Sequence, residues 1–201
     1  KDMQNKNNKQ NKGYTIIETM IAISIFLVVV MIGMTALLNA NLIHQKSQNM
    51  RSIMDNLSFI MEDMSRNLRT GYNYHCGNNF SSLDTSLSCP SGGGNNLIKL
   101  IAFEESATGD PLISSDQWVY KIESFNISKS INNGLNWVQL NPEEVKIDGV
   151  FSNFLVVGAE SLPGDRQQPF VTIRLVGKIT YKGVDSPFSL QTSVSQRLVD
   201  I

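Results

Sequence analysis

The stretch KGYTIIETMIAISIF, from Lys12 to Phe26, decides how this chain is built. A lysine-rich segment, a glycine and a tyrosine precede a long apolar run, and Glu18 stands a few residues inside that run. A lone carboxylate in a membrane costs on the order of 2.5–3.5 kcal/mol on insertion scales, so such residues usually have a functional partner. The first question is therefore what partner Glu18 has.

The run after Glu18 is long enough to cross a bilayer. Residues 19–38 carry no charge, and a helix of that length rises about 30 Å. Residues 1–12 hold four lysines and one acid, Asp2, and a basic flank of this kind favours a cytoplasmic N-terminus. The sequence predicts a single span of the cytoplasmic (inner) membrane, with the residues after Asn39 outside the cytoplasm. Because residue 1 is lysine, we also expect an incomplete or trimmed start.

Three kinds of N-terminal segment could contain such a run. A secretory signal peptide has an apolar core of roughly 7–15 residues and a small-residue cleavage site, and this run is longer. A plain signal anchor is compatible with the length but gives no reason for Glu18. The third kind requires both Gly13 before the run and Glu18 within it.

The hexapeptide Gly13-Tyr14-Thr15-Ile16-Ile17-Glu18 resembles the processing site of type IV pilin-like proteins, which include pilins, pseudopilins and competence pseudopilins. In that family a membrane peptidase cuts after the glycine and methylates the new N-terminal residue, usually phenylalanine. Tyr14 departs from phenylalanine but is still aromatic. Glutamate stands at the fifth position of the mature chain, where Glu18 falls. The resemblance implies a leader of residues 1–13, cleavage between Gly13 and Tyr14, and N-methylation of Tyr14.

The resemblance also implies an assembly salt bridge. Cleavage exposes an ammonium on Tyr14, and in the family this ammonium on an incoming subunit meets the glutamate of a subunit already in the filament. Two such charges in contact are worth roughly 4 kcal/mol at an effective dielectric constant of about 20. The alternative for Glu18 is a side chain that reaches back to the lipid headgroups.

The helix is predicted to continue far beyond the membrane. No glycine or proline occurs between Met34 and Thr70. Two rows of apolar residues mark one helical face: Ile43, Met50, Leu57 and Met64, and Ile53/Met54, Ile60/Met61 and Leu68. We expect one helix of about 55 residues and roughly 80 Å, with residues 14–38 as its transmembrane, filament-core half and residues 39–70 as its amphipathic half. Gly71 would end it. We expect the chain's own sheet to cover the apolar face of the second half. The alternative is that two copies of the helix pair through this face as a dimeric coiled coil.

Residues 71–96 are rich in glycine, asparagine and serine, and predict a polar loop. They contain both cysteines, Cys76 and Cys89, which outside the cytoplasm read as one disulfide. Free thiols in a poorly oxidising compartment are one alternative. A metal site at His75 and Cys76 is another, although two candidates do not make a ligand set.

Strand-like segments follow, and with the loop they would make residues 71–201 a head domain. The segments are 97–103, 117–125, 126–131, 135–140, 154–157, 169–181 and 188–194, closed by 193–201. A hairpin turn is predicted at Asn132-Asn133-Gly134. The expected fold class is α+β: a long N-terminal helix packed on one antiparallel meander of about five to seven strands, which is also the pilin-like architecture that the resemblance implies.

Nothing in the sequence predicts catalysis or a cofactor. The chain has two histidines and no phosphate-binding loop, Gly-x-Ser-x-Gly or His-Glu-x-x-His motif. Asp110 and Asp116 could contribute to a calcium site of the kind some family members have, but calcium needs six to eight oxygens and no such loop is visible. We therefore expect no catalytic, cofactor-binding or metal-binding residue, and no enzyme.

The sequence thus favours a structural subunit, a minor pilin or pseudopilin of a type IV pilus or a type II secretion-like filament outside the inner membrane, extracellular or periplasmic. The expected partners are other pilin subunits, the prepilin peptidase, the inner-membrane assembly platform and, before assembly, the lipid bilayer. The net charge of −1 and the spread of lysine and arginine predict no nucleic-acid surface, although a DNA-capturing role for a tip subunit stays open. The alternative function is a monomeric, membrane-anchored binding domain outside the cytoplasm.

Overall fold

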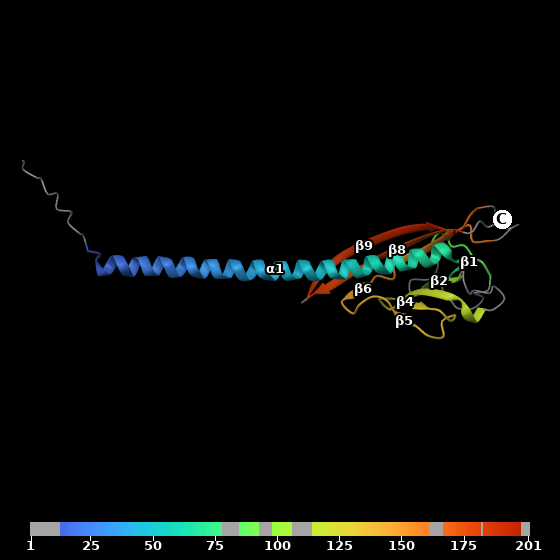
Figure 1. Ribbon diagram of the computed structural model, residues 1–201, viewed down its shortest axis with the longest axis horizontal. Helices are drawn as coiled ribbons and strands as arrows, with labels where there is room; N and C mark the ends of the chain where they lie inside the picture. The colour runs from blue at the N-terminus through green and yellow to red at the C-terminus, as the bar shows by residue number, and fades with distance from the viewer. Residues whose placement is uncertain are drawn as a thin grey trace, which may run out of the picture. The chain divides into compact units, whose positions relative to one another are not determined.

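The computed structural model describes residues 13–77, 85–92, 98–105, 114–160, 167–181 and 183–197. The chain divides into two compact units, Lys1–Gln48 and Asn49–Ile201. One helix, α1 (Ile16–Thr70), belongs to both, and the strands all belong to the second unit (Figure 1). We describe the two units in turn.

The described part of the first unit consists of α1 and the residues just before it. Its large apolar side chains from Ile16 to Ile43 are exposed, except that Val30 is half-buried. By length and composition α1 contains a stretch that could cross a membrane. The helix continues through Gly33, where no neighbouring atom lies within 4 Å of a Cβ built on this residue. The residue is therefore neither a break in the helix nor a close contact within this chain.

The second half of α1 confirms the predicted apolar face. Five side chains of the two predicted rows are buried: Leu57, Ile60, Met61, Met64 and Leu68. Met50, Ile53 and Met54 are partly buried against the same core. The helix ends before Gly71, where an added Cβ would lie 2.4 Å from a ring carbon of Phe103. The glycine is required here because the chain passes directly over that ring.

Five strands form one antiparallel sheet in the order β1-β2-β3-β4-β5. They are β1 (Tyr72–Gly77), β2 (Ile98–Glu104), β3 (Trp118–Glu123), β4 (Asn126–Ser130) and β5 (Val138–Gln139), with a short 3-10 helix η1 (Ser114–Asp116) before β3. The prediction of a polar loop from residue 71 is wrong for β1, whose residues Tyr74, His75 and Cys76 are buried. The reason is that β1 pairs along β2, which leaves three consecutive residues of β1 buried, with Tyr74 and Cys76 in the hydrophobic core.

Four more strands form a second antiparallel sheet around β8. They are β6 (Val145–Ile147), β7 (Asn153–Val157), β8 (Phe170–Tyr181) and β9 (Val184–Ser195). β6 and β7 pair with successive parts of one edge of β8, and β9 pairs with the other edge along its whole length. The predicted single meander is therefore wrong: the strands divide into two sheets, with β6 as a strand that the sequence did not predict.

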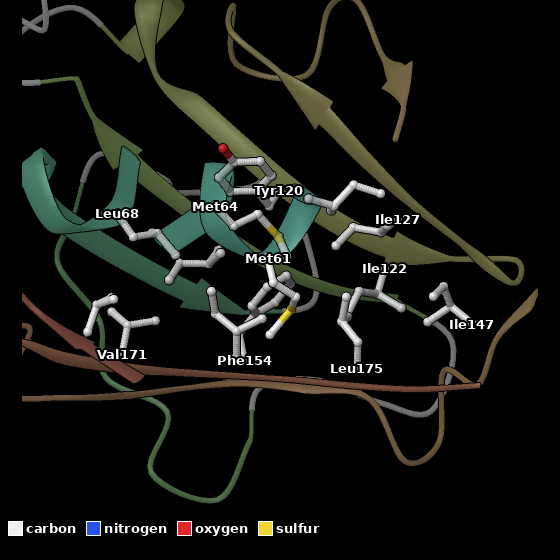
Figure 2. Packing of buried hydrophobic residues seen from close by; sticks show 14 of the residues in the cluster. Met61, Met64, Leu68, Tyr120, Ile122, Ile127, Ile147, Phe154, Val171 and Leu175 are labelled. Carbon is white, nitrogen blue, oxygen red and sulfur yellow. The ribbon is translucent and has the colours of Figure 1, made fainter. Parts of the chain in front are cut away.

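One hydrophobic core joins α1 to both sheets in the second unit. Figure 2 shows Met61, Met64 and Leu68 of α1 together with side chains of β3, β4 and the second sheet. A smaller cluster on the opposite face of the first sheet contains Leu100, Ala102 and Val119, with Trp137 packed against it. The architecture is α+β, with one long N-terminal helix packed against antiparallel sheets, as the sequence predicted.

Candidate processing and assembly site

The predicted cleavage point lies at an open end of the described chain. Gly13, Tyr14 and Thr15 precede α1 without regular structure, and no atom lies within 4 Å of a Cβ built on Gly13. The side chain of Tyr14 is 84% exposed. A peptidase that must take an extended segment into its own active site needs such access. Residues 1–12 of the predicted leader lie outside the described residues.

Glu18 closes the first turn of α1 on Thr15. The amide of Glu18 lies 3.1 Å from the carbonyl oxygen and 3.4 Å from the hydroxyl oxygen of Thr15. In return the amide and hydroxyl of Thr15 lie 3.4 and 3.5 Å from Oε2 of Glu18. This reciprocal pair is a capping box, in which a threonine and a glutamate three residues later satisfy free donors at a helix start. The capping box was not predicted from the sequence, although the Thr-x-x-Glu spacing is its signal.

The capping box changes what Glu18 can do. In a single chain its carboxylate has local donors and lies at the positive end of the helix dipole, so it is not without partners. Both of its contacts to Thr15 are long, however, and use only Oε2. A carboxylate can accept from several donors at once. Glu18 can therefore keep the helix start and still accept a charged donor from another molecule.

The surface that follows Glu18 has one chemical character. Its large exposed side chains as far as Leu38 are isoleucine, leucine, valine, methionine and phenylalanine, and the first charged residue after Glu18 is Lys46. The three hydroxyls along this stretch are satisfied by the helix itself, because Thr19, Ser24 and Thr35 donate to backbone carbonyls of the preceding turn. Such a surface suits lipid or other apolar helices and not water.

A second candidate site surrounds the two cysteines. Cys76 on β1 and Cys89 form a disulfide with a Cα–Cα distance of 5.7 Å. His75 is buried, and its Nδ1 lies 2.7 Å from the carbonyl oxygen of Thr85. Among the residues that the structure describes, no group of three or more histidine, cysteine or carboxylate side chains could hold a metal ion. His75 acts here as a hydrogen-bonded core residue.

Glu160 fixes the segment around Cys89 from the other side. Its carboxylate accepts the hydroxyl of Ser88 and, at 2.8 Å, the amide of Ser88. Desolvation acts to raise the pKa of Glu160, but these hydrogen bonds outweigh it and hold the pKa below its ordinary value. The amide of Ala159 donates to the Ser88 hydroxyl at 3.0 Å. The arrangement is a structural clamp, which could not be predicted from the sequence because Ser88 and its partners lie about 70 residues apart in the chain.

A groove of about 320 Å³ lies between α1 and β9. It is lined by Ser58, Met61, Glu62, Ser65, Leu190, Gln191 and Thr192. The lining contains one carboxylate, that of Glu62, and three hydroxyls, but no histidine or cysteine. Of the calcium candidates, Asp116 lies at the end of η1 and Asp110 lies outside the described residues.

Comparison with known proteins gives one match. The prokaryotic N-terminal methylation motif matches residues 8–35, which includes Gly13, Tyr14 and Glu18. Neither a curated protein nor a solved structure matches the chain. The motif and the α+β architecture support the type IV pilin-like family, which is structural and non-enzymatic. The motif in general implies assembly with other pilins and processing by a prepilin peptidase. An apolar N-terminal helix with this motif fits a membrane-anchored protein.

Proposed function

We propose that this chain is a structural subunit, a minor pilin or pseudopilin, of a type IV pilus or a type II secretion-like filament. It is inserted into the inner membrane with its N-terminus inside, cut after Gly13 and methylated on Tyr14. It then enters the filament through its apolar helix. The observation that carries the proposal is the methylation motif over residues 8–35 placed at the start of a helix whose next exposed surface is entirely uncharged.

The proposed role of Glu18 is to accept the Tyr14 ammonium of a neighbouring subunit. The capping box holds the carboxylate at the helix start, beside the point where a new N-terminus forms. In lipid the charged carboxylate is poorly solvated, and a matching ammonium from another copy removes that penalty. Assembly is favoured because it pairs two groups that are each unfavourable alone in the membrane.

The partners follow from this sequence of events. The prepilin peptidase acts first, the lipid bilayer holds the subunit, the assembly platform extracts it, and other pilin subunits surround its helix in the filament. The head domain outside the membrane is stabilised by the disulfide between Cys76 and Cys89. The proposed filament is extracellular for a pilus and periplasmic for a secretion pseudopilus.

Mass spectrometry of the mature chain tests the proposal. The full chain is expressed with a prepilin peptidase, and the expected product begins at Tyr14 with one added methyl group. A Gly13→Ala variant is the control, since it should leave the leader attached. A mature chain that begins elsewhere, or that keeps its leader in the presence of active peptidase, would favour the rival function of a monomeric membrane-anchored binding domain.

A further inference from the structure

The outer edge of β9 is a long row of backbone groups that face away from the sheet. Among the residues that the structure describes, β8 is the only strand paired with β9. The amide of Gln196 donates to the carbonyl oxygen of Pro169, so even-numbered residues of β9 bond to β8 and odd-numbered residues turn their amides and carbonyls outward. No hydrogen bond joins the outward amides of residues 189–195 to another described residue.

Only the first part of this edge is protected. Natural proteins protect exposed strand edges with charged residues, proline or bulges. Asp185 and Pro187 lie at outward positions near the start of β9, and proline has no amide to offer another strand. Residues 188–195 contain neither proline nor a charged residue, and no bulge interrupts their pairing with β8. The second part of β9 is therefore open to another strand.

The helix α1 takes the place of a neighbouring strand only at the end of this edge. Arg197 is the next outward position after β9, and its amide donates a 2.8 Å hydrogen bond to the carbonyl oxygen of Arg69. Toward the middle of β9, the groove of about 320 Å³ lies between the strand and α1, which run side by side in Figure 1. Its volume is in the range of ligand-binding clefts, about 300–1,000 Å³. Gln191, whose amide faces outward, lines this groove.

The groove combines apolar and polar groups. Met61, which is buried, and Leu190, which is half-buried, supply the apolar part. Ser58, Ser65 and Glu62 supply two hydroxyls and one carboxylate. Glu62 is exposed and forms no ion pair with a residue that the structure describes. A matching ligand therefore has backbone-like hydrogen-bonding groups, apolar side chains and one positive charge.

We propose that this groove binds an extended peptide segment of another protein, which adds to β9 as a further strand. Its backbone bonds to the outward groups of residues 189–195, as in other cases of strand addition. Because successive side chains of a strand point to opposite faces, every second side chain lies toward Met61 and Leu190 and is apolar. A lysine or arginine of the segment pairs with Glu62.

The charge of the groove favours a foreign segment over a second copy of β9. Residues 184–195 contain no lysine, arginine or histidine, so a second β9 would leave Glu62 without a cation. All residues of the site belong to the second unit. The inference therefore goes beyond the proposed function and applies equally to a filament subunit and to a membrane-anchored binding domain.

Selection from a library of random peptides displayed on phage tests the proposal. The peptides are roughly nine residues long, within the usual length of a strand, and the target is the full chain in detergent micelles. Peptides that bind the unaltered chain are then depleted on Gln191→Pro, which removes an outward amide and no bond to β8. The survivors should alternate apolar and polar residues and carry a lysine or arginine. A selection that leaves no survivor would overturn the proposal.

The surviving peptides are synthesised, and their affinities are measured by fluorescence anisotropy. Ser193→Pro should weaken binding roughly tenfold, because another outward amide is lost. Ser193→Ala is the matched control: it keeps the amide and changes only a hydroxyl that lies 2.9 Å from the hydroxyl of Thr172. Glu62→Gln should weaken binding by up to about fivefold, as expected for an exposed ion pair. Equal affinities for Ser193→Pro and Ser193→Ala would overturn strand addition, and an unchanged affinity for Glu62→Gln would overturn the pairing with a cation.

Methylating the amides of a bound peptide one at a time tests the geometry on the unaltered chain, so the result does not depend on how a variant folds. In an added strand every second amide bonds to β9. N-methylation should therefore weaken binding roughly tenfold at alternate positions and much less between them. Losses without this alternation would overturn the proposal. Dimers of the unaltered chain in analytical ultracentrifugation that Gln191→Pro abolishes would assign the edge to a second copy and would also overturn it.

Discussion

The side-chain amide of Asn67 on α1 donates a 2.9 Å hydrogen bond to the phenol oxygen of Tyr120 on β3. The same phenol donates to the carboxylate of Asp63 at 3.3 Å, and Lys129 on β4 lies 3.4 Å from that carboxylate. Tyr120 itself is buried in the core. The contact therefore fixes the amphipathic half of α1 to the first sheet through a polar group inside an apolar interface.

Replacing Tyr120 by phenylalanine should lower the free energy of unfolding by about 1–2 kcal/mol, because Asn67 and Asp63 lose a partly buried partner while the ring stays. Urea unfolding of the full chain in mild detergent, followed by near-ultraviolet circular dichroism, measures this change. A double-mutant cycle with Asn67→Ala isolates the hydrogen bond. Strictly additive effects of the two substitutions would show that the contact contributes nothing.

Much of this helix could be predicted from the sequence. The spacing of Leu57, Met61, Met64 and Leu68 fixes which face is buried, because the period of an α-helix is a local property. The long alternation of residues 170–181 likewise identified β8. The partners of these elements could not be predicted, since they depend on pairing between distant segments.

The missed strands have the same explanation. β6 has three residues, and each pairs with a residue of β8 that lies 30 to 34 positions later in the chain. β1 was read as a loop because its surroundings are polar, but pairing with β2 buries Tyr74 and Cys76. The capping box between Thr15 and Glu18 is different: it is local and could have been predicted from its spacing alone. Whether Glu18 also meets another subunit depends on contacts that one chain does not contain.

Stability should fall at alkaline pH because of two buried tyrosines. Burial raises the pKa of Tyr74 and of Tyr120 above the ordinary value, since the charged phenolate is poorly solvated in the core. Below pH 10 both tyrosines are neutral in either state, so the contribution to stability is fully present. Above about pH 10 only the unfolded chain ionises, and stability should fall by about 1.4 kcal/mol per pH unit for each tyrosine.

Urea unfolding at a series of pH values measures this slope. The series extends about 2 units on either side of the ordinary tyrosine pKa, so it begins near pH 8. Above pH 10, the free energy of unfolding of Tyr120→Phe should fall less steeply with pH, by the contribution of one tyrosine, about 1.4 kcal/mol per pH unit. Near neutral pH, the free energies of unfolding of the variant and the unaltered chain should differ by a constant amount. An unchanged slope in that variant would contradict the assignment.

The disulfide between Cys76 and Cys89 should stabilise the head domain by about 3 kcal/mol, because it closes a loop of this size in the unfolded chain. The Cys76→Ser/Cys89→Ser double variant should therefore unfold at a lower urea concentration. Adding a reductant should bring the unaltered chain to the same midpoint and should not change the double variant. Equal midpoints for the oxidised chain and the variant would remove the stabilising role.

The register of β9 predicts where proline is tolerated. The amide of Gln196 donates to the carbonyl oxygen of Pro169, and one-to-one pairing continues from Phe170↔Ser195 to Tyr181↔Val184. Even-numbered residues of β9 therefore bond to β8, and the amides of odd-numbered residues point away from it. Pro187 lies at an odd position, where no ladder bond is lost.

Thr192→Pro should consequently destabilise the head by about 1–3 kcal/mol more than Gln191→Pro, because only the first removes a ladder hydrogen bond. Thr192→Ala and Gln191→Ala are the side-chain controls, and thermal unfolding of the full chain is the measurement. A larger loss for Gln191→Pro than for Thr192→Pro would mean that the register is shifted by one residue, and equal losses would mean that the Thr192 amide makes no ladder hydrogen bond.

Glu18 offers the sharpest separation between its two roles. Glu18→Gln keeps the capping box, since glutamine also fills the third position of this motif, but it removes the charge that would meet a Tyr14 ammonium. The variant should insert into the membrane and be processed normally. It should enter filaments roughly a thousandfold less favourably, because an ion pair worth about 4 kcal/mol is lost.

Thr15→Ala is the matched control: it weakens the helix start and leaves the charge, so assembly should continue. The measurement is the fraction of each variant in sheared filaments relative to the membrane fraction, and incorporation of Glu18→Gln at the level of the unaltered chain would rule out the salt bridge as the force that selects a new subunit.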